Sequence, residues 1–426
     1  MNSKWKWIAL VAGIPATCIG AIGFIAGLLL VSEGTGTYEF TLWIIGLYIT
    51  LGCGLALLLH AIFSLRNQPS KPARLPPLWV LVWGLVLCAG LGWAVFDRPS
   101  GSWVFPPVFL LAAALPPLAA LSWGSERQAV LTWRQIILCF VLGSTAAVVL
   151  AIILETALPA VVMVFIQELF DQIGQNFSSL LGILSEGRIS SELSSRYFMY
   201  YLVELAVIAP LAEELVKPLV VLPLLRHARN SRQAFWIGAA AGAGFAFLEN
   251  IIYTMSRMSS WVGILALRAL SAAIHPLGAG LVGLGWYELF HSTDQSGWVR
   301  LENWLKRFGA AAGIHALWNG GSAVILTLVS TGFFSKAGAD VDLFGVTFAG
   351  IGLAFLVIVE GGALLAFRYL AQKPVEGDAY QFFREGGLSP ISQPQSRSLA
   401  LWAAACLLAI LPLLVEALNS LPAAQP

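Results

Sequence analysis

Apolar residues run through the chain in long blocks that short polar stretches interrupt. A helix of about 20 apolar residues spans the roughly 30 Å of hydrocarbon in a bilayer. Blocks of that length recur along the whole chain, and they predict an all-α, polytopic membrane bundle of about eleven transmembrane helices. The predicted spans cover residues 7–31, 40–63, 78–96, 103–123, 136–166, 198–225, 234–255, 261–290, 308–329, 343–370 and 399–418.

The loops between the predicted spans differ in their content of basic residues. Lys and Arg concentrate in every second loop, beginning with Lys4 and Lys6 before the first span. Because basic loops favour the cytoplasmic side, the N-terminus is predicted to be cytoplasmic. The first apolar block is too long for the core of a signal peptide, so we interpret it as a retained membrane helix. The expected location is the prokaryotic plasma membrane, with the lipid bilayer around the protein.

Composition supports a membrane protein and argues against other classes. Of the 426 residues, 58% are hydrophobic and 11% are charged, whereas a soluble domain carries about 25% charged residues. The formal net charge of +1 offers no surface for a polyanion, which argues against a nucleic-acid partner. The five cysteines lie far apart inside apolar blocks and indicate neither a disulfide framework nor a thiolate metal site. No pattern specifies an oligomeric state.

The distribution of polar residues suggests four parts. Residues 1–166 are predicted to form an N-terminal five-helix membrane region, and residues 167–197 an acidic, Ser-rich outer loop. Residues 198–331 form a four-helix core that carries most of the charge placed inside spans. Residues 332–426 form a C-terminal two-helix region, whose cytoplasmic linker at 372–398 is rich in Gly, Pro, Ser and Gln.

The sixth span contains three ionisable residues close together. An ionisable side chain in hydrocarbon costs about 2.5 to 3.5 kcal/mol, so it needs a partner, water or a function. Glu213 and Lys217 are four residues apart and share a helix face, while Glu214 points about 100° away and is expected to be left free. Pro210 and Pro218 predict a kinked segment. A structural salt bridge is the simpler interpretation of the Glu213 and Lys217 pair.

The seventh span adds a further carboxylate. Glu249 lies on one stripe with Phe245 and Tyr253, because the three residues follow at steps of four. The glutamate is therefore predicted to face a partner helix rather than lipid. A hydrogen bond to Tyr253 is the simpler alternative to a functional role.

The eighth and ninth spans each contain a histidine. Arg268 precedes His275 by two turns, and His315 shares a face with Asn319. With the predicted boundaries, His315 lies only about 10 Å from the inner face of the membrane, against about 20 Å for His275. The ninth helix must therefore tilt or begin earlier, within residues 301–307, for the two histidines to meet. A packing role for both histidines is the alternative.

These residue types fit one kind of hydrolytic chemistry. A catalytic zinc site has three protein ligands, often two His and one Glu, and keeps an open position for water. A further carboxylate then acts as general base. The sixth to ninth spans contain all of these groups, so they can supply activated water for attack on an amide carbonyl.

The motifs resemble those of the PrsW family of intramembrane proteases, which is distantly related to the CAAX prenyl proteases and bacteriocin-processing proteins. Glu213-Glu214-Leu-Val-Lys217 looks like the family's EExxK, and residues 245–253 look like its FxxxExxxY. His275 and His315 look like its two later histidines. The resemblance covers residues 197–329.

The resemblance implies an intramembrane metalloprotease that cleaves a membrane-anchored or membrane-proximal protein, such as an anti-sigma factor in regulated proteolysis. Glu213 and Glu214 are the implied acid and base, with Lys217 beside them, and Asn319 is the implied oxyanion or substrate donor. The implied ligands of a divalent metal, with zinc as the expected ion, are Glu249, His275 and His315.

Two other functions fit membrane carboxylates and histidines. A proton- or cation-coupled transporter also uses such residues as proton relays, although it is often built from inverted repeats, and no repeat is visible. A non-catalytic membrane scaffold is the second alternative. It predicts that replacing Glu214 by Gln leaves every phenotype intact.

Overall fold

The computed structural model describes residues 10–11, 13–22, 25, 54–66, 70–96, 104–125, 130–159, 196–256, 258–328 and 343–373. Within these ranges the secondary structure is helical, apart from an isolated bridge between Pro72 and Thr132. The all-helical class agrees with the sequence pattern. Nearly all of the predicted outer loop at 167–197, nearly all of the linker at 372–398 and the span at 399–418 lie outside the described residues.

The first part of the chain supplies α3 (Ala56–Leu65), α4 (Leu78–Phe96), α5 (Phe105–Ser125) and α6 (Trp133–Leu142), which continues through the π-helical turn η3 (Gly143–Ala147). The second part begins with α8 (Arg196–Val203), the π-helical turn η4 (Glu204–Ile208), α9 (Ala209–Leu219) and α10 (Leu222–Leu225). It goes on with α11 (Ser231–Met255), the 3-10 turn η5 (Met258–Ser260), α12 (Trp261–Ala269), α13 (Ile274–His291), α14 (Gly297–Leu328) and α15 (Leu343–Gln372).

Several helices have the length and apolarity of membrane spans. Among the described residues five helices qualify, or six if the bent pair α12 and α13 counts as one span. The predicted spans at 78–96, 103–123, 136–166, 234–255 and 343–370 correspond to helices of this group. The count of eleven spans and the cytoplasmic N-terminus remain predictions.

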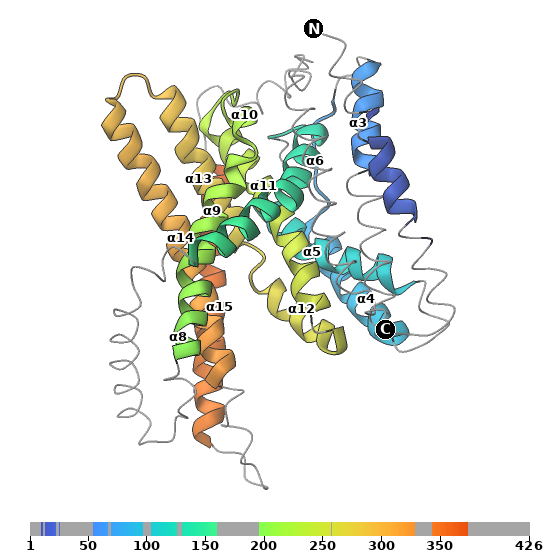
Figure 1. Ribbon diagram of the computed structural model, residues 1–426, viewed down its shortest axis with the longest axis vertical. Coiled ribbons are helices and arrows are strands. Elements are labelled where there is room, and N and C mark those ends of the chain that lie inside the picture. The colour runs from blue at the N-terminus through green and yellow to red at the C-terminus, as the bar shows by residue number, and fades with distance from the viewer. Residues whose placement is uncertain are drawn as a thin grey trace, which may run out of the picture.

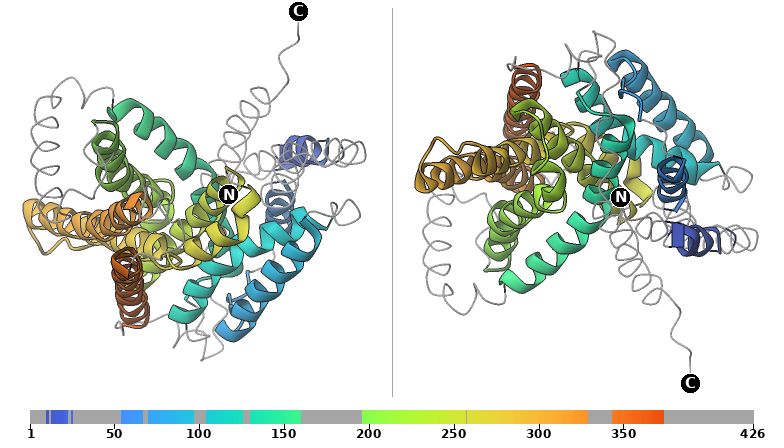
Figure 2. Two further views of the ribbon diagram at one scale, coloured as in Figure 1. Left: turned by 90° about the horizontal axis from the view of Figure 1, so that it is seen from below. Right: turned by 90° about the horizontal axis from the view of Figure 1, so that it is seen from above.

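Helix α11 lies at the centre of the bundle. In its membrane-length window 94% of the residues are buried, and it packs against α13, α6, η3 and α5. The α13–α14 hairpin and α4 lie on opposite sides of the molecule (Figures 1 and 2). One apolar core joins α5, α6, α11 and α15, so helices from the predicted N-terminal and C-terminal regions pack directly on the predicted four-helix core. The four-part domain division itself stays a prediction.

Glycines allow α11 and α13 to approach closely. A Cβ atom at Gly242 would lie 2.2 Å from the carbonyl oxygen of His275, and one at Gly238 would lie 2.2 Å from that of Ala279. Small residues with this spacing let two helix backbones meet in a membrane. The α11–α13 contact therefore sets the height at which His275 enters the bundle.

The polar helices are broken, as the sequence predicts for the first of them. The π-helical turn η4 ends immediately before the α9 segment that contains Pro210. A proline cannot donate a backbone hydrogen bond, so the helical ladder changes register there. The predicted eighth span is also divided, because α12 and α13 meet at an angle of 44°.

The helix that contains the predicted ninth span begins before residue 308. Helix α14 begins at Gly297 and runs without a break to Leu328. The first three turns of α14 are rich in charged residues. They therefore fall outside the predicted apolar span, although they are helical. The predicted depth of His315 required this helix to tilt or to begin earlier for the side chain to meet His275, and α14 does begin earlier.

Candidate active site

Three buried side chains of α9 form the base of the candidate site. The Lys217 ammonium donates to Glu213 Oε2 at 2.9 Å and to Glu214 Oε1 at 2.7 Å. The lysine side chain is fully buried, as is that of Glu214. The expectation that Glu214 is left free is therefore wrong, because a long lysine side chain reaches carboxylates both three and four residues before it.

Only one oxygen of Glu214 is engaged in this way. Glu214 Oε2 is buried and makes no hydrogen bond with the described residues. It lies against α13, where a Cβ atom at Gly278 would come within 2.3 Å of it. Glycine at this position thus provides the space for the carboxylate.

His275 contacts the cluster through both ring nitrogens. Its Nδ1 lies 2.8 Å from Lys217 Nζ and 3.7 Å from Glu213 Oε2. Its Nε2 lies 2.8 Å from Glu249 Oε2 and, at a longer distance of 3.2 Å, near Arg268 Nη2. Since an ammonium can only donate and a carboxylate can only accept, we assign the ring proton to Nε2 and a lone pair to Nδ1.

His315 has the complementary arrangement. Its Nδ1 lies 2.9 Å from Glu214 Oε1, so we assign the ring proton to Nδ1. Its Nε2 is buried without a hydrogen-bond partner among the described residues and lies 3.8 Å from Glu213 Oε2. The two imidazole rings are 4.9 Å apart and nearly perpendicular. Both unprotonated nitrogens therefore lie near Glu213 Oε2, and that of His275 accepts a hydrogen bond from the Lys217 ammonium.

A buried arginine, to which the sequence pattern assigned no role in the site, neutralises Glu249. Arg268 Nη2 lies 2.5 Å from Glu249 Oε2, and Arg268 Nε donates to Asn250 Oδ1 at 3.0 Å. The guanidinium also lies over the ring of Tyr253 at 5.1 Å. The sequence signal for this residue is its charge inside an apolar segment, which requires a partner.

The structure brings a possible set of metal ligands together. An oxygen of Glu213 and ring nitrogens of His275 and His315 all lie within 4.8 Å of one another, and the three residues are buried. Ligand atoms about 2.0 to 2.2 Å from a tetrahedral zinc are separated by about 3.3 to 3.6 Å. The distances of 3.7 and 3.8 Å from Glu213 Oε2 are close to this range. The residues therefore fit a divalent metal.

The other sequence-predicted residues occupy different positions. Glu249 contacts Nε2 of His275, the ring nitrogen that does not face Lys217, and forms an ion pair with Arg268. Glu213, by contrast, lies near both imidazoles. Asn319 follows His315 by one turn of α14 and is half-buried, without a hydrogen bond to the described residues. The site thus contains both predicted histidines and all three glutamates, with Lys217 between them.

With all three carboxyl groups ionised, the cluster would contain more acidic than basic charges. Glu213, Glu214 and Glu249 are balanced by the two cations Lys217 and Arg268, which leaves one negative charge when both histidines are neutral. A buried charge without compensation is unfavourable in a membrane. An added cation would remove this imbalance.

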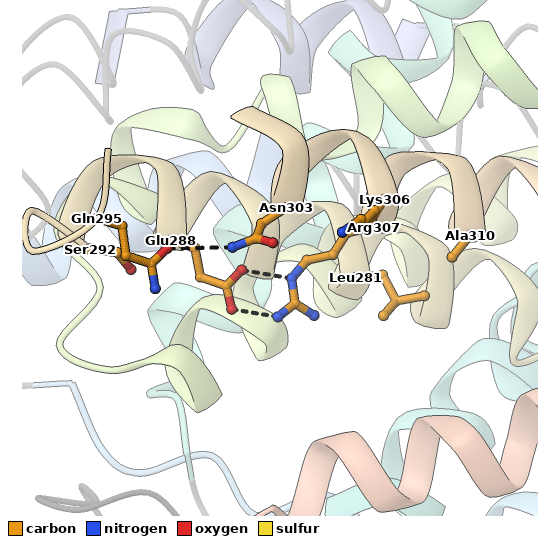
Figure 3. A pocket seen from close by; sticks show the side chains of 8 residues that line it. All are labelled: Leu281, Glu288, Ser292, Gln295, Asn303, Lys306, Arg307 and Ala310. Carbon is orange, nitrogen blue, oxygen red and sulfur yellow. Dashed lines mark hydrogen bonds and ion pairs between the residues drawn. The ribbon is translucent and has the colours of Figure 1, made fainter. Parts of the chain in front are cut away.

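A separate open pocket of about 400 Å³ lies between α13 and α14, outside the cluster (Figure 3). Arg307 forms a two-pronged ion pair with Glu288 there, with 2.8 Å between Arg307 Nε and Glu288 Oε2. The pair joins the two helices that carry His275 and His315. Since its charges are satisfied within the pocket, we interpret it as a structural clamp of the hairpin.

Comparison with known proteins identifies a family that the chain matches. A protein-family model described as PrsW family intramembrane metalloprotease matches residues 131–359, which is more than half of the chain. The match includes every member of the cluster and extends from α6 into α15, beyond the four predicted core helices. No curated protein and no solved structure shows significant similarity to the chain.

Proposed function

The chain belongs to the PrsW family of intramembrane metalloproteases, and we propose on that premise that it hydrolyses a peptide bond of a membrane-anchored or membrane-proximal protein. One observation carries the proposal. Two buried imidazoles, each held by a different carboxylate, have their other ring nitrogens within 3.8 Å of Glu213 Oε2. This arrangement is typical of a two-histidine, one-carboxylate metal site.

We propose that Glu213, His275 and His315 hold the metal, with zinc as the expected ion. A bound divalent metal polarises a carbonyl group and lowers the pKa of water from 15.7 to about 7. Glu213 replaces Glu249 in the ligand set suggested by the sequence motifs. Support comes from the mutual distances of the three groups and from the unpartnered Nε2 of His315.

The other two glutamates orient the ligands in this proposal. Glu214 fixes the tautomer of His315, and Glu249 fixes that of His275, as carboxylates commonly do for metal-binding histidines. Arg268 keeps Glu249 ionised and in place. The positions of both imidazoles therefore depend on charged partners from three other helices.

Glu214 also has the position of a proton carrier. Its unpartnered Oε2 can accept a proton from the attacking water and later donate it to the leaving amine. Lys217 holds the opposite oxygen, Oε1, and so fixes the direction of the carboxylate. Asn319, on the same face of α14 as His315, remains a proposed donor to the carbonyl oxygen of the substrate.

The burial of the site favours a substrate that approaches within the bilayer. The glutamates, the histidines, Lys217 and Arg268 of the cluster are all buried among helices. An anti-sigma-factor-like membrane protein in regulated proteolysis is the proposed type of substrate. The proposed location is the prokaryotic plasma membrane, with the N-terminus in the cytoplasm.

Purified protein in detergent provides the test. We expect wild type to contain zinc and to cleave a single-span substrate, and His275→Ala and His315→Ala to lose both properties. His291→Ala is the matched control, because His291 is an exposed histidine of the same hairpin. Chelation of the metal should stop cleavage, and added zinc should restore it. Cleavage by both site variants at the wild-type rate would overturn the proposal.

A further inference from the structure

A fourth buried glutamate reaches the site region from outside the recognised motifs. Glu360 lies on α15, a helix of which only 22% of the membrane-length window is buried. Its neighbour Ile358 is 71% exposed, whereas Glu360 is 5% exposed. The carboxylate thus points into the bundle from the buried face of α15, which also carries Leu356 and Phe367.

Glu360 binds the point at which α13 begins. Its Oε1 accepts a hydrogen bond from the backbone N–H of Ala273 at 2.9 Å. Ala273 is the N-cap residue of α13, follows the 44° bend after α12, and has no side chain that could cap the helix. The first N–H groups of a helix need acceptors, and a carboxylate is favoured there by the helix dipole. Glu360 therefore caps α13 from a different helix.

His275 follows the capped residue by two positions. A slip of α13 by one residue would move the imidazole about 1.5 Å along the axis and rotate it about 100°. The contacts of His275 with Lys217 and Glu249, both at 2.8 Å, do not tolerate such a change. The place where α13 begins therefore decides whether His275 meets the cluster.

We propose that Glu360 is a positioning residue for the metal site: by capping α13 at Ala273 it sets the height and orientation of His275. The inference rests on the proposed metal-binding function. It adds a residue that contacts neither the cluster nor the substrate, and that lies just beyond the stretch matched by the family model. The presence of a carboxylate among the apolar residues on the buried face of α15 is thereby explained.

Two variants of the full chain separate the cap from the bulk of the side chain. Glu360→Gln keeps a carbonyl oxygen that can accept from Ala273, whereas Glu360→Met has a similar length without an acceptor. Zinc affinity is measured by competition with a chelator in detergent. We expect Glu360→Met to bind zinc about 10 to 100-fold more weakly than wild type, as for other residues that support metal ligands. Glu360→Gln and the control Ile358→Ala should stay close to wild type.

A second measurement distinguishes this inference from the proposed function. The ¹⁵N chemical shifts of the His275 imidazole, assigned with His275→Ala, should change in Glu360→Met and return in Glu360→Gln. If wild type binds zinc and Glu360→Met binds it equally, the positioning role is overturned while the proposed function stands, even if Glu360→Met melts at a lower temperature. If wild type binds no zinc, the proposed metal function fails, and unchanged His275 shifts in Glu360→Met would overturn the positioning role as well.

Discussion

His315 donates its Nδ1–H to Glu214 Oε1 across 2.9 Å, although the two residues are 101 positions apart in the chain. This hydrogen bond leaves Nε2 of His315 without a proton and directed toward Glu213. Glu249 acts in the same way on the other histidine, with the roles of the two ring nitrogens exchanged. The site therefore contains two pairs of a carboxylate and an imidazole, Glu214 with His315 and Glu249 with His275. Both imidazoles also lie near a third carboxylate, that of Glu213.

The first prediction separates the two functions of Glu214. In Glu214→Gln the side-chain carbonyl can still accept from His315, but the group no longer carries a proton during the reaction. We expect kcat to fall about 100-fold or more, while zinc stays bound at near wild-type stoichiometry. Steady-state kinetics and metal analysis of the same preparation provide the measurement. An unchanged kcat would show that a group other than Glu214 carries the proton.

The second prediction decides between the two possible carboxylate ligands. Glu213→Gln removes a proposed ligand and should abolish stoichiometric zinc binding. Glu249→Gln removes only the support of His275 and should weaken zinc affinity about 10 to 100-fold. Chelator competition gives both values. If Glu249→Gln abolished zinc binding and Glu213→Gln only weakened it, Glu249 would be the metal ligand. Glu213 would then belong with the acid and base groups.

The third prediction concerns Lys217, which shares Glu213 Oε2 and His275 Nδ1 with the proposed metal. In Lys217→Met the buried carboxylates lose their cation, so the metal-free protein should be less stable by about 3 to 5 kcal/mol. Zinc should then raise the melting temperature more in this variant than in wild type, because no ammonium competes for the same atoms.

The matched control is Lys306→Met, since the Lys306 side chain is 68% exposed in a surface ion pair with Glu302. Thermal melts in detergent with and without zinc provide the comparison. Equal stabilisation of wild type and Lys217→Met by zinc would show that the lysine and the metal do not share ligands.

The fourth prediction tests the space beside Glu214. In Gly278→Ala the new Cβ would lie 2.3 Å from Glu214 Oε2, so the carboxylate must move by about 1 Å. A misplacement of this size can reduce the rate about 100-fold, with a smaller effect on folding because the end of a side chain yields more easily than backbone. Gly309→Ala on α14 is the control, since nothing lies within 4 Å of a Cβ there. Wild-type activity in Gly278→Ala would contradict a fixed Glu214.

Helix α14 illustrates the difference between an apolar block and the helix that contains it. The charged residues at 300–307 ended the predicted apolar span, yet the helix continues through them to Gly297. Hydropathy reports where a helix lies in lipid, whereas helix propensity and packing decide where it begins. Glu360 went unnoticed for a related reason, because it belongs to no motif and its contact with Ala273 joins residues 87 positions apart.

The sequence by itself determined that the chain is a helical membrane protein and which helices carry buried charge, because apolar length and helical periodicity are local properties. It also determined the candidate residues, through motifs whose members share a helix face. Only the tertiary structure decided which atoms meet. It placed Glu213 rather than Glu249 between the imidazoles, brought Lys217 to both acidic residues of α9, and joined Glu360 to the start of α13. Those contacts depend on how each helix is rotated and how closely it approaches its neighbours, and the glycines that permit the approach acquire this meaning only when the partner helix is in place.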